Sequence, residues 1–361
     1  MINDEPQTPF LAVDLDLLDR NIARMAKVII HDGKKNWRPH VKAIKTPAIA
    51  HKLIAAGAIG VTCAKLSEAE VMAAAGIQDI LVANQIVSPA KLRHLARLNR
   101  QVRITSAVDD PKVVDELEAI ACAEGVRVPV VVEVDVGLGR AGVAPGSAVV
   151  QLARHIDASQ HVEFAGLMSW EGQTAHIRDA AEKEAKVRAA VDRLVQSAAL
   201  CEQAGLAVKL VSCGGTGTYL ITSRIAGVTE LQAGGGVFGD VRYRDEYGVA
   251  HDCALTIWCT VTSRPRADRI VCDAGWKAMA RFPTLPEPVG LMDVAVGDIR
   301  MSAEHTTLDL KQPAARPAIG DRLQFNVGYS DSTVFLHDVI VGMRNGAVET
   351  VWRLLARGRL Q

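Results

Sequence analysis

The stretch Arg38–Lys45 holds the first side chains whose type and spacing suit covalent chemistry. An apolar run, Trp37–Val41, ends in a polar cluster, and Lys42 stands where this run meets a helical segment. If the run is the first strand of a barrel, Lys42 lies at its carboxyl end, where barrels place their reactive groups. A lysine that loses part of its hydration there can form an imine with a carbonyl compound. The alternative is a solvated lysine in a plain loop.

Two glycine-rich runs suit a different task, the binding of an anion. They read Cys-Gly-Gly-Thr-Gly-Thr over residues 213–218 and Gln-Ala-Gly-Gly-Gly over residues 232–236. Glycine leaves backbone N–H groups open, and a hydroxyl and a helix start add to the attraction for phosphate. Barrels often hold a phosphate between the loops after their seventh and eighth strands. A phosphate site and an imine-forming lysine in one barrel indicate pyridoxal phosphate (PLP), a cofactor that needs both.

Eight apolar runs alternate with helical patterns over the first 250 residues, and these elements must position the reactive groups. Most of the runs are apolar on both faces, as expected for parallel strands that are covered on both sides. The sequence therefore predicts an α/β fold with a (β/α)8 TIM-type barrel over residues 10–250. A doubly wound open sheet has the same number of runs and stays open as an alternative. The runs are Trp37–Val41, Gly60–Ala64, Ile80–Asn84, Arg103–Val108, Pro129–Val136, Phe164–Trp170, Val208–Cys213 and Glu230–Val237.

After about residue 250 the helical periodicity gives way to short alternating runs. Proline and glycine separate these runs, and Asn345-Gly346 is a strong hairpin signal. The pattern predicts an all-β C-terminal domain over residues 251–361. We expect the N-terminal strand, about residues 1–14, to join this domain.

The charge balance favours a small-molecule partner. Lys plus Arg and Asp plus Glu number 41 each, so we expect neither nucleic acid nor a membrane as a partner. No apolar run reaches the roughly 18 residues of a membrane helix, and Met1–Pro9 does not resemble a signal peptide. The 7 cysteines form no Cys-x-x-Cys pair, which favours reduced thiols and a cytoplasmic location.

The order of these motifs resembles that of the fold-type III PLP-dependent D-threonine aldolase and D-serine dehydratase family, whose barrel is similar to that of alanine racemase. The resemblance covers nearly the whole chain and implies a PLP barrel, a following β domain and a homodimer. The matching motifs are Thr8-Pro9, Arg38-Pro-His-Val-Lys42, Glu133-Val-Asp-Val-Gly-x-Gly-Arg140, the Gly-Gly-Thr-Gly loop, Thr229-Glu-Leu-Gln-Ala-Gly234, Asp273-Ala-Gly275, Glu304-His305, Phe335-Leu-His-Asp338 and Trp352-x-x-x-Ala-Arg357.

The resemblance also implies roles for single residues. Lys42 would be the Schiff-base lysine, and Arg140 would contact the phenolate oxygen of PLP. Glu171 either reaches the pyridine nitrogen of PLP and keeps it protonated, or it is an exposed glutamate of a loop. The residues implied in cofactor binding are Lys42, His40, Arg140, Trp170, Glu171, Gly215, Thr216, Gly217, Gln232, Gly234 and Gly235.

One departure from the family pattern concerns a metal ion. Many members bind a divalent ion (Mg, Mn or Zn) through a His-x-Asp or His-x-Cys pair, and here Tyr329-Ser-Asp331 stands at that place. Neutral tyrosine is a poor ligand, and one carboxylate holds a divalent ion weakly. Either Asp331 binds the ion together with His305 or His337, or the enzyme dispenses with it. Tyr329 then offers its hydroxyl to the substrate as a donor or a general acid/base.

A second departure is Ile44, which stands where the family commonly has another histidine. By strand alternation this side chain would share the face of Lys42. Isoleucine there removes a polar neighbour and makes the pocket drier.

These implications predict a PLP-dependent lyase, an aldolase, that acts on D-configured 3-hydroxy amino acids. D-threonine, 3-hydroxy-D-aspartate and α-methylserine-like compounds would give glycine or alanine and an aldehyde or keto acid. Tyr329, Asp331 and His305 are the candidates for handling the substrate hydroxyl. The alternatives are a dehydratase of D-serine or 3-hydroxy-D-aspartate, an amino-acid racemase, and a non-catalytic PLP-binding protein.

Overall fold

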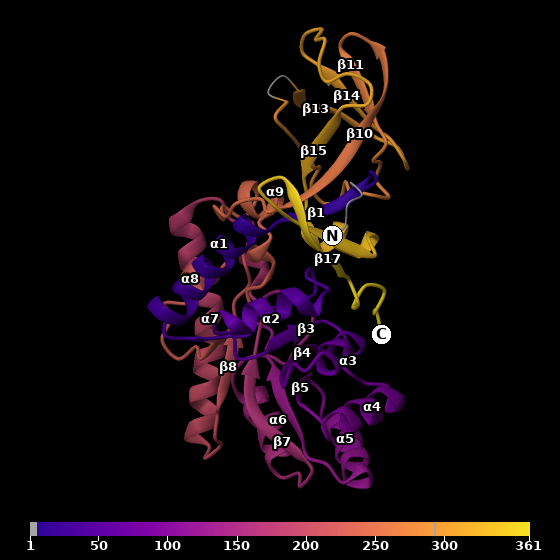
Figure 1. Ribbon diagram of the computed structural model, residues 1–361. Coiled ribbons are helices and arrows are strands. Elements are labelled where there is room, and N and C mark those ends of the chain that lie inside the picture. Colours follow the sequence, from indigo (N-terminus) through magenta and orange to yellow (C-terminus); the bar gives the residue numbers. More distant parts are fainter. Residues whose placement is uncertain (1–5, 292–293) are drawn as a thin grey trace. The chain divides into compact units, whose positions relative to one another are not determined.

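The computed structural model describes residues 6–291 and 294–361, and its chain forms two compact units (Figure 1). We call them the barrel unit and the β unit. The barrel unit comprises Arg24–Lys42, Pro47–Gly234 and Arg359–Gln361. The β unit comprises Met1–Ala23, Ala43–Thr46 and Gly235–Gly358.

The barrel unit is built on a sheet of eight parallel strands among the described residues. Their order in the sheet is β2-β9-β8-β7-β6-β5-β4-β3, so neighbours in sequence are neighbours in space. The strands are β2 (Asn36–Trp37), β3 (Val61–Cys63), β4 (Asp79–Gln85), β5 (Arg103–Val108), β6 (Val128–Glu133), β7 (Val162–Met168), β8 (Leu210–Cys213) and β9 (Glu230–Leu231).

Backbone hydrogen bonds between β3 and the segment after β2 close this sheet into a ring. His40 and Thr62 form a parallel bridge. The N–H of Thr62 donates to the carbonyl of Pro39 at 2.9 Å, and the N–H of Val41 donates to the carbonyl of Thr62 at 2.8 Å. The predicted (β/α)8 barrel is therefore confirmed, and the open sheet is excluded. The eighth predicted run is shorter than expected because the chain turns into a 3-10 helix at Gly235–Val237.

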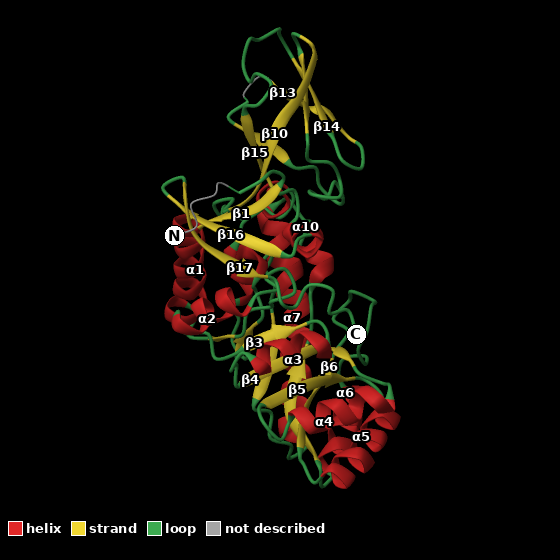
Figure 2. Ribbon diagram, turned by 45° about the vertical axis from the view of Figure 1, so that its right-hand side comes forward, coloured by secondary structure: helices red, strands yellow, loops and turns green. Residues whose placement is uncertain are grey.

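Helices follow the barrel strands, and Figure 2 shows them packed around the strands. Helix α5 illustrates why they form where they do. Asp110 accepts a hydrogen bond from the N–H of Lys112 at 2.8 Å, Pro111 occupies the first turn, and Gly125 ends the helix with a left-handed φ of 64°. None of the helices in the described residues combines the length and hydropathy that a membrane span requires.

The helices of the chain are α1 (Leu15–Ala26), α2 (Pro47–Ala55), α3 (Leu66–Ala74), α4 (Pro89–Leu98), α5 (Pro111–Glu124), α6 (Ser147–Asp157), α7 (Ala180–Gln203), α8 (Tyr219–Thr222), α9 (Val241–Asp245) and α10 (Ser330–Thr333). A π-helical segment, Lys27–Asp32, follows α1.

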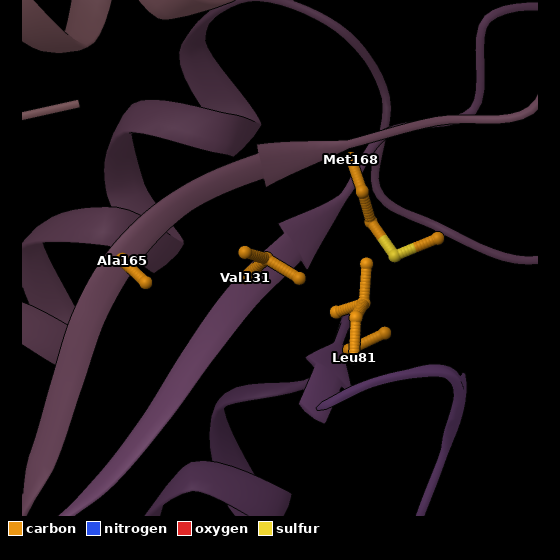
Figure 3. Close-up of a cluster of buried hydrophobic side chains, with 5 residues drawn as sticks. Leu81, Val131, Ala165 and Met168 are labelled. Atoms are coloured by element: carbon orange, nitrogen blue, oxygen red, sulfur yellow. The ribbon is translucent and has the colours of Figure 1, made fainter. Parts of the chain in front are cut away.

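Side chains from four neighbouring strands pack into one apolar cluster of the barrel unit (Figure 3). Leu81 on β4, Ala107 on β5, Val131 on β6, and Ala165 and Met168 on β7 are all buried. Small and large side chains alternate across the strands, which lets the layers interdigitate. This apolar packing supports the carboxyl ends of the same strands, where the polar loops begin.

The β unit contains a second, mostly antiparallel sheet with the order β13-β14-β11-β10-β1-β16-β17, in which β15 pairs with β10 and β12. The predicted all-β domain is therefore confirmed as a fold class. The strands are β1 (Phe10–Asp14), β10 (Leu255–Arg266), β11 (Arg269–Cys272), β12 (Glu287–Val289), β13 (Val294–Met301), β14 (Thr306–Leu310), β15 (Arg322–Asn326), β16 (Val339–Arg344) and β17 (Ala347–Arg353).

Strand β1 lies between β10 and β16, and the rings of Phe10 and Trp258 stack there with centroids 6.0 Å apart. Residues 1–5 of the expected N-terminal strand lie outside the described residues. The domain boundaries 10–250 and 251–361 stay a proposal.

Gly166 gives a direct test of the barrel packing. It sits at a register shift between β6 and β7, and its φ is 145°. A Cβ atom there would meet the carbonyl oxygen of Leu210 on β8 at 2.0 Å. We expect Gly166→Ala to lower the free energy of unfolding by about 3 kcal/mol, measured by urea unfolding. Gly76→Ala is the matched control, because its φ is 88° but nothing lies within 4 Å of the added atom. Equal losses in the two variants would contradict the packing argument.

Candidate active site

Lys42 lies in the first turn after β2, and its side chain is exposed. Its backbone N–H donates to Nδ1 of His40 at 3.3 Å, so this ring nitrogen acts as an acceptor. The N–H of His40 donates in turn to the carbonyl of Gln232 at 2.9 Å. Three residues that the sequence predicted to share a site are therefore neighbours in the barrel unit.

Ile44 does not share a strand face with Lys42, contrary to the prediction. Residues 42–44 form a turn, because the pairing with β3 ends at Val41, and side chains of a turn do not alternate between two faces. Lys45 ends the turn with a φ of 58°, and Ile44 is fully buried. Ile44 therefore acts as a packing residue of this turn.

The glycine loop after β8 is folded on itself. The carbonyl of Gly215 accepts from the N–H groups of Thr218 and Tyr219 at 3.0 and 2.9 Å. The N–H of Gly215 lies 3.2 Å from Oγ1 of Thr218. The hydrogen bonds found among the described residues leave the N–H of Gly217 unused. This loop can therefore offer backbone N–H to an anion.

Glu171 anchors this loop through hydrogen bonds. One carboxyl oxygen, Oε1, accepts from the hydroxyls of Thr218 at 2.6 Å and Thr222 at 3.1 Å, while Oε2 accepts from the N–H of Gly214 at 3.3 Å. The side chain is 0% exposed, so the interpretation of Glu171 as an exposed loop residue was wrong. Burial raises the pKa of its carboxyl, and the three donors oppose this rise.

Trp170 packs against the same loop. A Cβ atom on Gly215 would meet the indole ring at 2.3 Å, and one on Gly172 would also meet it at 2.3 Å. The missing side chain of Gly215 therefore makes room for Trp170. The two residues that follow β7 thus hold the glycine loop between them, one by packing and one by hydrogen bonds.

Gln232 joins the lysine segment to the glycine loop through its backbone. Its N–H lies 3.1 Å from the carbonyl of Cys213 and 3.2 Å from that of Gly214, while its own carbonyl accepts from His40. A Cβ atom on Gly234 would meet the carbonyl oxygen of His40 at 2.2 Å, so only glycine lets these segments approach.

Arg140 lies in the loop after β6, and its side chain is more than half exposed. Its guanidinium lies 3.7 Å from the buried carboxyl of Glu133, which also accepts from the amide of Gln85 at 2.5 Å. Burial raises the pKa of Glu133, while Gln85 and Arg140 lower it. Glu133 and Gln85 therefore restrict where the Arg140 side chain can point.

In the β unit, Tyr329 and Asp331 form a pair. The hydroxyl of Tyr329 donates to Oδ2 of Asp331 at 2.9 Å. The guanidinium of Arg242 lies 4.7 Å from the centroid of the Tyr329 ring, and the Tyr243 ring meets that ring edge-on at 6.0 Å. Burial and the neighbouring Asp331 raise the pKa of Tyr329, so its hydroxyl keeps its proton and acts as a donor.

The two histidines considered as metal ligands lie in different surroundings of the β unit. Nε2 of His337 bonds to the carbonyl of Ala278 at 2.6 Å, so this nitrogen carries the proton and cannot coordinate an ion. Burial also lowers the pKa of His337. The side chain of His305 is exposed. Within residues 6–291 and 294–361, no group of three His, Cys, Asp or Glu side chains has the arrangement of a metal site.

Several residues of this arrangement were missed in the sequence. Thr218, Thr222, Ser212 and Gln85 all bond to buried carboxyl groups. Of these four residues, only Thr218 could be suspected from the sequence, because it belongs to the repeated Gly-Thr of the glycine loop. The others lie in ordinary strand and helix patterns, and their partners are distant in sequence.

Known proteins resemble this chain along its whole length. The family described as "Alanine racemase, N-terminal domain" matches residues 13–242, and the one described as "Putative serine dehydratase domain" matches residues 254–343. A 3-hydroxy-D-aspartate aldolase of Paracoccus denitrificans (strain Pd 1222) is 36% identical over 99% of this chain and 94% of its own length. A D-threonine aldolase of Arthrobacter sp is 36% identical over 97% of this chain and 93% of its own.

The solved structure of a D-threonine aldolase from Filomicrobium marinum has a TM-score of 0.94 at 34% identity, over 98% of this chain and 97% of that one. The chain belongs to the fold-type III D-threonine aldolase family. The resemblance predicted from the sequence motifs is therefore confirmed, and PLP is the cofactor of this family.

The barrel unit fits this cofactor. An exposed lysine and an open N–H on a glycine loop are the two features that a phosphate-bearing aldehyde needs, and Gln232 connects them. The loop N–H groups can hold a phosphate only while the loop keeps its shape, and that shape depends on Glu171.

We expect Glu171→Ala to weaken PLP binding at least about 10-fold. The change leaves the N–H of Gly214 without its acceptor, at a cost of about 1–3 kcal/mol. The hydroxyls of Thr218 and Thr222 keep only their bonds to the carbonyls of Gly215 at 3.3 Å and Thr218 at 3.2 Å, which loosens the phosphate loop. The dissociation constant can be measured by titrating the apoenzyme with PLP and following its absorbance. Glu202→Ala, an exposed glutamate at the end of α7, serves as the control and should bind like wild type. An unchanged affinity in Glu171→Ala would contradict the anchoring role.

Proposed function

We propose that this chain is a PLP-dependent lyase, an aldolase, that cleaves D-configured 3-hydroxy amino acids. D-threonine, 3-hydroxy-D-aspartate and α-methylserine-like compounds are the proposed substrates, with glycine or alanine and an aldehyde or keto acid as products. The observation that carries the proposal is the run of hydrogen bonds from the N–H of Lys42 through His40 and Gln232 to the glycine loop. The activities named for the two 36% identical relatives support carbon–carbon cleavage.

The residues proposed to hold PLP belong to the loops that follow the barrel strands. Lys42 would bind it covalently, Arg140 would contact its phenolate oxygen, and Trp170 would cover it. Its phosphate would lie on Gly215, Thr216, Gly217, Gly234 and Gly235. When bound, PLP takes up the electron pair that remains on Cα after a bond to Cα breaks.

The groups proposed to act on the substrate hydroxyl lie in the β unit. Asp331 would accept the hydroxyl proton as the Cα–Cβ bond breaks and the carbonyl of the aldehyde forms. Tyr329, which keeps its proton and donates to Asp331, would hold that carboxylate in place. Lys42 would return a proton to Cα, which completes glycine. His305 remains the alternative proton acceptor.

A dehydratase of D-serine or 3-hydroxy-D-aspartate is the second candidate. The match of residues 254–343 to a serine dehydratase domain favours it. In that reaction Lys42 would remove the Cα proton, and the substrate hydroxyl would leave with a proton from Tyr329 or His305. A divalent metal ion at Asp331, a homodimer and a cytoplasmic location also remain proposals.

Lys42→Ala should abolish the visible absorbance of lysine-bound PLP, because no other group is proposed to bind the cofactor covalently. The measurement is an absorbance spectrum of protein purified with PLP and then freed of excess cofactor. Lys91→Ala, an exposed lysine on α4, should keep the wild-type spectrum. A colourless wild-type protein would refute PLP dependence, and a coloured Lys42→Ala protein would refute the role of Lys42.

The reaction can be assigned from its products. We expect incubation with D-threonine, D-phenylserine or 3-hydroxy-D-aspartate to release glycine and an aldehyde or keto acid, while the L-enantiomers give none. Release of ammonia and a 2-oxo acid from D-serine or 3-hydroxy-D-aspartate, with no glycine, would assign the dehydratase instead. Glycine is measured by amino-acid analysis and ammonia by a coupled assay.

A further inference from the structure

A chain of polar side chains runs through the interior of the barrel unit and ends on Gln232. The guanidinium of Arg38 donates from Nε to Oε2 of Glu230 at 2.9 Å. The other carboxyl oxygen of Glu230 accepts from the hydroxyl of Ser212 at 2.8 Å. The side-chain amide of Gln232 lies 3.0 Å from the oxygen of the same hydroxyl. All four side chains are buried.

The direction of each hydrogen bond in this row of side chains follows from the charge of Arg38, where the row begins. Burial raises the pKa of the Glu230 carboxyl, but Arg38, a permanent cation, donates to it directly and keeps it ionised. An ionised carboxylate can only accept, so the single proton of the Ser212 hydroxyl must point to Glu230. Ser212 can then only accept from Gln232. The amide nitrogen of Gln232 must therefore face Ser212.

The strand geometry places the other end of this amide at the mouth of the barrel. Gln232 directly follows β9, and its backbone still pairs with Cys213 and His40, so by alternation its side chain shares a face with that of Glu230 and lies beyond the carboxyl end of the strand. The backbone of Gln232 joins the Lys42 segment to the glycine loop. Since the amide nitrogen bonds to Ser212, Oε1 lies on the other side of the amide and is left as an acceptor.

An acceptor in this place selects among the atoms of PLP. The phosphate oxygens and the phenolate oxygen are acceptors themselves, whereas a protonated ring nitrogen is a donor. We propose that Gln232 Oε1 binds the protonated ring nitrogen of PLP; this inference rests on the proposed cofactor site. Glu230 and Ser212 are then positioning residues that orient the amide of Gln232. A PLP ring with a protonated nitrogen withdraws electrons from Cα of the bound substrate more strongly than an unprotonated ring does.

This assignment replaces the role considered for Glu171. The carboxyl oxygens of Glu171 are taken by Thr218, Thr222 and Gly214, and the side chain is fully buried under the glycine loop. Gln232, in contrast, has one end of its amide fixed by Ser212 and the other end directed away from it. The two residues therefore serve different parts of the cofactor.

The test uses the holoenzyme with PLP labelled with 15N at the ring nitrogen. In wild type we expect the 15N resonance at the upfield position of a protonated pyridine. Gln232→Met keeps the length of the side chain but removes the acceptor, and it should move the resonance downfield toward unprotonated pyridine while the cofactor stays bound. Gln203→Met, on the exposed end of α7, is the matched control and should leave the resonance unchanged.

Two further variants separate recognition from positioning and keep the test valid if Gln232→Met does not fold. Gln232→Glu retains an acceptor and should keep the resonance upfield. Ser212→Ala removes the hydroxyl that orients the amide, and it should shift the resonance downfield by less than Gln232→Met does.

A wild-type resonance at the position of unprotonated pyridine, or an unchanged one in Gln232→Met, overturns the assignment of Gln232. An unchanged resonance in Ser212→Ala overturns the positioning role of Glu230 and Ser212. If wild type holds no PLP, no bound resonance appears, and the proposed function fails rather than this inference.

Discussion

A buried cation, Arg38, is the constraint on which the barrel unit depends. Its side chain lies inside the ring of strands, bonded to Glu230 on one side and to both carboxyl oxygens of Asp79 at 2.8 and 3.2 Å on the other. Removing one partner of such a pair leaves an unpaired buried charge, at a cost of about 3–5 kcal/mol. Since Arg38 directly follows β2 and Glu230 opens β9, the ion pair spans two neighbouring strands. It joins them just below the turn that carries Lys42.

The same physical rule explains the loops at the carboxyl ends of the strands. A buried carboxyl group must find donors, and each one here finds them on a neighbouring segment. Glu133, the last residue of β6, bonds to Gln85 and pairs with Arg140, while Glu171 after β7 bonds to the loop after β8. Each acid thus fixes the loop beside its own strand. The polar residues at the mouth are held in place by satisfied hydrogen bonds rather than by side-chain packing alone.

The sequence predicted what depends on local pattern. Apolar runs revealed the barrel strands, and the position of Lys42 after the first run followed from strand order alone. The burial of Glu171 could not be predicted, because it depends on Thr218 and Thr222, which are 47 and 51 residues away in sequence. The prediction for Ile44 was wrong for a related reason. Strand alternation holds only while pairing continues, and the pairing of this segment ends at Val41.

The replacement of the expected histidine by Tyr329 changes what Asp331 can do. A histidine would leave the carboxylate to share an ion, whereas the tyrosine hydroxyl donates to it. Arg242 lies over the face of the tyrosine ring, and Tyr243 packs against its edge, so the ring cannot easily turn away. Asp240 holds the same segment, because it accepts from the N–H and the hydroxyl of Ser330, each at 2.8 Å.

A carboxylate held in this way is oriented without a metal ligand beside it. The hydroxyl of Tyr329 fixes the direction of the oxygen that it bonds, Oδ2 of Asp331. In the proposed reaction, a carboxylate oriented in this way would accept the proton of the substrate hydroxyl. The half-buried Asp331 therefore resembles the acids of the barrel loops in one respect: a fixed hydrogen-bond donor orients its carboxylate.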